Sequence, residues 1–143
     1  MNKTAFLNIL ENVFPPAVNQ ALNNWFLKGA QAEAEVTLTS ETTYEMPFNS
    51  DNRFPKLILG AQNITALTAT VGDLSEGDEV QFRITQDGTG ARTVSFSTGF
   101  AAAGGTDPTV TASTDAVDVF KGIVTGGEIL IIGLAQDIAT LTA

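Results

Sequence analysis

The 143-residue sequence contains no cysteine and no histidine. Without cysteine, disulfides, thiolate chemistry and cysteine-ligated zinc are excluded. Without histidine, the chain lacks the usual proton carrier near neutral pH, and an ordinary serine triad cannot be built. None of the four lysines lies in a Ser-x-x-Lys setting. We therefore expect a protein that is not an enzyme and needs no cofactor.

Basic side chains are also scarce. Seven Lys and Arg residues stand against 16 Asp and Glu residues, which gives a formal charge of −9. Such a chain repels phosphate backbones, so we expect no nucleic-acid partner. The carboxylates crowd residues 73–79 and 107–118, where calcium is conceivable, but their spacing fits no EF-hand, and solvated acidic loops are the simpler reading.

Long apolar runs are missing. The N-terminal run AFLNILENVF, residues 5–14, is interrupted by Asn8, Glu11 and Asn12, and it does not have the form of a signal peptide. No window of the sequence reaches the uninterrupted apolar length that a membrane span requires. We therefore expect no membrane partner.

The N-terminal residues 1–31 are predicted to form a helical arm, ahead of a β body over residues 32–143. Apolar residues recur at helical spacing over 3–13 and 17–28, and Pro15-Pro16 separates the two stretches. Helices this short need a surface to lie on, either the sheet of their own subunit or another protein. The candidate partner-anchoring residues are Phe6, Leu10, Val18, Leu22, Trp25 and Phe26.

The clearest strand pattern of the β body is in the sequence EVQFRITQDGTGARTVSF, residues 79–96. Val80, Phe82 and Ile84 alternate with polar residues, which indicates a strand with one buried face. Asp87-Gly88 then resembles the turn of a β-hairpin, with Val94 and Phe96 on the returning strand. We therefore predict a hairpin here.

Further short strands are indicated on both sides of this segment, and Gly126-Gly127 is predicted to turn the chain into the last one. Eight or nine short strands predict a mainly β fold, an antiparallel β-sandwich or a jelly-roll-like body. The other predicted strands cover residues 33–39, 43–48, 56–60, 63–71, 117–124 and 129–134.

Two of these strands are apolar on both faces, at residues 57–59 and 129–134. A lone sandwich in water does not require this, so we predict that the surplus is buried between copies about a threefold axis. The candidate trimer contacts are Leu57, Leu59, Ile129 and Ile131.

The order of ITQDGTGARTVSF, the loop GGTDPTVT, the strand DAVDVF and a close near LAQDI resembles a β module of tailed-phage virion proteins, over residues 61–138. That module recurs in head fibres, capsid decoration proteins, tail fibres and spikes. The resemblance implies a structural or host-contacting role, usually as a homotrimer and without a catalytic site. One departure is Phe100 followed by Ala101–Ala103, where relatives carry bulkier or charged residues.

From this resemblance we expect a trimeric capsid decoration or head-fibre protein at the particle surface, assembled in the host cytoplasm. Its partners would be itself and the major capsid protein or another virion protein, reached through the arm. The alternative is a tail-fibre or vertex-spike component that binds a host glycan or receptor. The candidate aromatic platforms for a glycan are Trp25, Tyr44 and Phe100.

Overall fold

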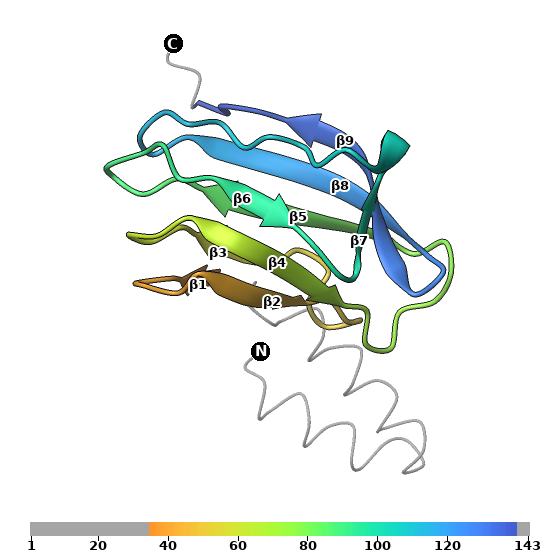
Figure 1. Ribbon diagram of the computed structural model, residues 1–143. Coiled ribbons are helices and arrows are strands. Elements are labelled where there is room, and N and C mark those ends of the chain that lie inside the picture. Colours follow the sequence, from red (N-terminus) through yellow and green to blue (C-terminus); the bar gives the residue numbers. More distant parts are fainter. Residues whose placement is uncertain (1–34, 140–143) are drawn as a thin grey trace, which may run out of the picture. The chain divides into compact units, whose positions relative to one another are not determined.

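The computed structural model describes residues 35–139, which form nine β-strands and one 3₁₀ turn (Figure 1). The predicted mainly β fold is therefore confirmed. The predicted helices, the arm 1–31 and its boundary lie outside the described residues. The elements are β1 (Glu35–Thr37), β2 (Thr43–Pro47), β3 (Lys56–Ile58), β4 (Ile64–Thr70), β5 (Glu79–Thr85), β6 (Val94–Phe96), β7 (Phe100–Ala102), η1 (Ala103–Gly105), β8 (Val117–Thr125) and β9 (Glu128–Ala135).

Consecutive strands alternate between two sheets over the first two thirds of the described chain. A six-stranded sheet has the order β1-β3-β5-β8-β9-β7, and a three-stranded sheet has the order β2-β4-β6. The chain thus makes three successive strand–arc–strand coils, which rise in Figure 1 from β1 and β2 through β3 and β4 to β5 and β6. This stacking of coils is solenoid-like.

Most strand pairs are parallel, against the antiparallel sandwich or jelly roll that the sequence predicts. Only β5–β8 and β8–β9 are antiparallel, whereas β1–β3, β3–β5, β2–β4, β4–β6 and β7–β9 are parallel. The physical reason is the connection type. Each arc crosses to the other sheet, so a strand returns beside the one before last and runs in the same direction.

The hairpin predicted at Asp87-Gly88 is therefore wrong. The strand before it, β5, lies in the large sheet, and the strand after it, β6, lies in the small sheet. The predicted turn at Gly126-Gly127 is confirmed, because β8 and β9 pair antiparallel across it and both glycines have positive φ, 62° and 79°. Positive φ at both central residues is the requirement of a type I′ hairpin turn.

Both sheets contribute to one hydrophobic core. Its centre is the ring of Phe82 on β5, which stacks on Phe120 of β8 with centroids 4.6 Å apart and planes 2° apart. Three more rings approach Phe82 at 5.3–6.1 Å, from Phe48, Phe96 and Phe100. The predicted inward face Val80, Phe82 and Ile84 is buried as expected.

The segment between η1 and β8 runs back along β8 and β9 (Figure 1). It covers the part of the core that lies past β6, the last strand of the small sheet. Its Val110 is buried in the core cluster. The buried carboxylate of Asp118 fastens this segment, because it accepts hydrogen bonds from Thr111 N–H at 2.6 Å, Thr111 Oγ1 at 2.8 Å and Asp137 N–H at 2.9 Å. A buried carboxylate is tolerated when donors surround it in this way.

Gly99 provides a test of how closely the chain passes β4 where it crosses from β6 to β7. A Cβ atom built at Gly99 would lie 2.1 Å from the carbonyl oxygen of Ala69, whereas one at Gly104 would meet nothing within 4 Å. Both glycines have positive φ, 88° and 69°. We expect Gly104→Ala to lower the free energy of unfolding by about 1–2 kcal/mol, and Gly99→Ala by clearly more. Urea unfolding would check this, and equal losses would contradict the close approach.

Candidate functional site

The four predicted trimer contacts do not lie on the surface. Leu57, Leu59, Ile129 and Ile131 are at most 9% exposed and belong to the chain's own core. They are therefore not available to a neighbouring copy, and the assignment is corrected. When a strand is apolar on both faces, its sequence does not show which face points into the core. The six candidate anchoring residues of the arm lie outside the described residues and stay a prediction.

The other face of these strands carries an aliphatic patch, defined here as Ile58, Val117, Val119, Ile123 and Leu130. Along β8, Asp118, Phe120, Gly122 and Val124 are buried, so the alternate residues point outward from the large sheet. Ile123 lies directly opposite Leu130 of β9, and both are half-buried. Beside them, Ile132 at the bulge of β9 is 49% exposed.

Charged residues around this patch form ion pairs. Arg83 of β5 pairs with Glu35 of β1, and Lys121 of β8 lies 3.4 Å from the carboxylate of Glu79. Arg53, in the loop before β3, lies 3.5 Å from the carboxylate of Asp78. Four of the five cations in residues 35–139 lie on this face or beside it, so the acidic excess gathers elsewhere.

The carboxylates of the acidic loops act as hydrogen-bond acceptors for the backbone. Asp73 accepts the N–H and the hydroxyl of Ser50 at 2.7 and 2.6 Å. Asp107 accepts the N–H of Phe96, and Glu76 accepts the N–H of Gly126, each at 2.9 Å. Within residues 35–139, no group of three or more His, Cys, Asp or Glu residues is placed to hold a metal ion.

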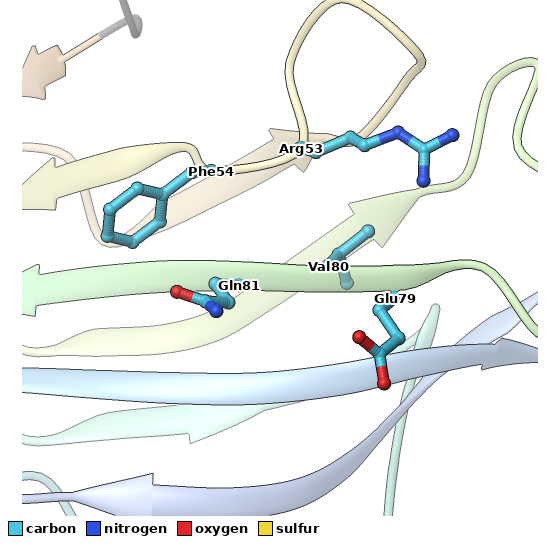
Figure 2. Close-up of a pocket in the computed structure, with 5 residues that line it drawn as sticks. All are labelled: Arg53, Phe54, Glu79, Val80 and Gln81. Atoms are coloured by element: carbon cyan, nitrogen blue, oxygen red, sulfur yellow. The ribbon is translucent and has the colours of Figure 1, made fainter.

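A shallow groove of about 270 Å³ opens beside the aliphatic patch (Figure 2). Arg53 and Phe54 come from the segment before β3, and Glu79, Val80 and Gln81 come from the start of β5. The N–H of Gln81 donates to the carbonyl of Arg53 at 2.9 Å, which fixes the two walls. The groove combines an aromatic ring with guanidinium, carboxylate and amide groups, a set that suits a hydroxyl-rich ligand.

The sequence NSDNRFP, residues 49–55, lies between two predicted strands, and its polar composition gives little indication of this groove. Its one signal is an aromatic residue, Phe54, inside an otherwise polar loop. The aromatic platforms that were predicted instead are occupied. Tyr44 packs against the core, where burial raises the pKa of its hydroxyl, and Phe100 belongs to the phenylalanine cluster. Trp25 lies outside the described residues.

A second hollow of about 180 Å³ lies next to β7. Small side chains make up much of its lining, and the carboxylate of Asp107 within it already accepts the Phe96 N–H. Its lining residues are Phe96, Phe100, Ala101, Ala102, Gly105, Asp107 and Ile131.

The arc between β5 and β6 is closed by two side chains. The buried amide of Gln86 donates to the carbonyl of Arg92 at 2.7 Å and accepts the Arg92 N–H at 3.1 Å. Burial raises the pKa of Asp87, but hydrogen bonds from the Gly90 N–H, from Arg92 and from the Thr89 N–H, with the charge of Arg92, hold that pKa below its usual value. The residues DGTGAR thus form a braced arc.

Comparisons with protein families, with curated proteins and with solved structures give no match for this chain. In the part of the chain that the structure describes, no helix has the length and hydropathy of a membrane span. The function must therefore be argued from the surfaces and hydrogen bonds described above.

Acidification should loosen the arc at Asp87. Its pKa is lower in the folded state, so its contribution to stability is complete above the unfolded value, near 3.9, and is lost as the pH falls through the folded value. We expect the amide protection factor of Gly90 in the wild type to be lower at about pH 3 than at about pH 6. In Asp87→Asn, the protection factor of Gly90 should be low at both pH values. Hydrogen exchange measures this, and unchanged wild-type protection at the lower pH would contradict it.

Proposed function

We propose that the chain is a bacteriophage virion structural protein, a homotrimeric capsid decoration or head-fibre protein at the particle surface. The observation that carries the proposal is how the β body uses its side chains. Polar groups of the described residues close the arcs, apolar groups fill one core, and five half-buried aliphatic side chains form the outward patch. Such a body is suited to contact and to bearing load.

Rigidity is the property that such a role requires. The arcs are fastened by carboxylate and amide side chains, and each coil is hydrogen-bonded to the next by a parallel ladder. A body of this kind can sit in many copies on a shell, where several weak contacts together give strong attachment. No chemistry at a catalytic centre is part of this proposal.

Attachment to the particle is assigned to the arm, residues 1–31, which is a proposal from sequence. Its apolar stripes contain the anchoring candidates Trp25 and Phe26, and large aromatic residues commonly dominate binding energy at protein contacts. The partner is the major capsid protein or another virion protein, and assembly takes place in the host cytoplasm.

The groove favours a second candidate function, that of a tail-fibre or vertex-spike component that binds a host-surface glycan. Phe54 provides an aromatic wall, and Arg53, Glu79 and Gln81 provide donors and acceptors within the same 270 Å³ space. Sugars present both apolar C–H faces and hydroxyl groups, so a site that combines these residue types fits them.

The arm is tested by Trp25→Ala with Phe26→Ala in the full chain. We expect the double variant to keep the melting temperature of the β body but to lose most co-sedimentation with particles of the virus that encodes it, because both proposed aromatic anchors are removed. A matched control is Leu134→Ala, which shortens an exposed apolar side chain of the β body on the face of β9 that does not carry the aliphatic patch. Undiminished co-sedimentation of the arm variant would refute the anchoring role.

The glycan alternative is tested with Phe54→Ala and Gln81→Ala. If the groove binds sugar, wild-type protein should retain a defined set of glycans on an array, and each variant should weaken that retention by about tenfold or more, since each removes one wall of the site. Glu45→Ala, on the outer face of the small sheet and away from the groove lining, serves as the control. Absence of glycan retention by the wild type would remove this candidate and leave the structural role.

A further inference from the structure

The outer faces of the two sheets differ in chemistry. The small sheet presents polar side chains to the outside, as a water-exposed sheet face normally does. The large sheet presents the aliphatic patch on β3, β8 and β9. The small sheet's outward residues include Thr43, Glu45, Thr68, Thr70 and Ser95.

Charge is distributed in the same unequal way. The cations of the large sheet's outer side stand next to carboxylates, in the pairs Arg83–Glu35 and Lys121–Glu79. The chain as a whole has a formal charge of −9. Two copies that meet through this side bring balanced charge together, so their contact avoids the repulsion that the acidic excess of the chain would otherwise impose.

Two polar atoms on the outward side of β5 are enclosed without a hydrogen-bond partner. They are Nε of Arg83 and Oγ1 of Thr85, and among the described residues no other side-chain atoms share this state. Thr85 lies in register between Ile58 and Val117 of the aliphatic patch. An enclosed polar atom without a partner is costly, and both of these atoms lie on the side of the sheet that carries the aliphatic patch.

We propose that this face, the aliphatic patch with Arg83 and Thr85, is the surface through which one copy of the chain binds another copy. A second copy is the occupant that the charges favour, because its own neutral, aliphatic face is complementary to the first. The inference rests on the proposed function only for the number of copies: two such faces that meet flat close a dimer, whereas in the proposed homotrimer each copy shares this face between its two neighbours about the threefold axis.

The test replaces one opposed aliphatic pair by an opposed ion pair. Ile123→Lys combined with Leu130→Glu keeps the net charge and gives the two strands a favourable cross-strand pair. We expect wild-type full-length protein to sediment as an oligomer at micromolar concentration, and this variant to associate at least about a hundredfold more weakly, about one decade for each lost aliphatic contact.

The matched control places the same pair on the other sheet, as Thr43→Lys with Ala66→Glu, whose positions are also in register. This control should associate like the wild type. Thermal melting shows whether each variant is folded, and if the Lys–Glu variant is not, Ile123→Thr with Leu130→Thr provides the same comparison with residues that favour strands.

The outcomes separate this inference from the virion role. A monomeric wild type, or a folded patch variant that associates as strongly as the control, overturns the proposed face. An oligomer of two copies that the patch variant abolishes supports the face and removes the trimer from the proposed function. Binding to viral particles is measured independently, so its failure leaves the self-association result standing.

Discussion

The contact on which the structure depends is the stack of Phe82 on Phe120, with the rings of Phe48, Phe96 and Phe100 around Phe82. Parallel coils have no hairpin turns to hold their two sheets in register, so packing between the sheets must do so. The cluster joins β5 and β8 of the large sheet to β6 of the small one. Aromatic rings suit this position because each buries a large area in a defined geometry.

Stacked coils also explain the use of acidic residues. Every arc leaves backbone N–H groups without a partner in a ladder, and buried or half-buried N–H groups must be satisfied. Short carboxylates serve this purpose at Asp73, Asp87 and Asp107. Part of the acidity of the chain thus has a structural cause, because these carboxylates accept hydrogen bonds from the backbone.

Alternation predicted which side chains point inward, but not which strands pair. Val80, Phe82 and Ile84 were assigned correctly, because a period of two fixes the two faces of any strand. A hairpin and an arc leave the same alternation on their flanks, so Asp87-Gly88 gave no sign that the next strand joins the other sheet. The same limit applies to Ile129 and Ile131, since only the register decides which face of a doubly apolar strand is buried. The groove does not follow from the sequence for a related reason: its walls, Phe54 and Gln81, meet only because β3 pairs with β5.

The ends of the coil stack show why another copy would bind at the side. Solenoid-like bodies can grow by adding strands at their ends, and natural proteins block those edges. At one end, the antiparallel β8–β9 hairpin occupies the edge of β5, so the parallel sequence of coils stops there. At the other end, the edge strand β2 contains Pro47, which has no N–H to donate to a further strand. Strand addition is disfavoured at these two places, and the broad outer face of the large sheet offers apolar contact of a different kind. The β8–β9 hairpin that ends the stack also supplies Val117, Val119, Ile123 and Leu130, so one element both ends the run of parallel coils and supplies most of the face that we propose for self-association.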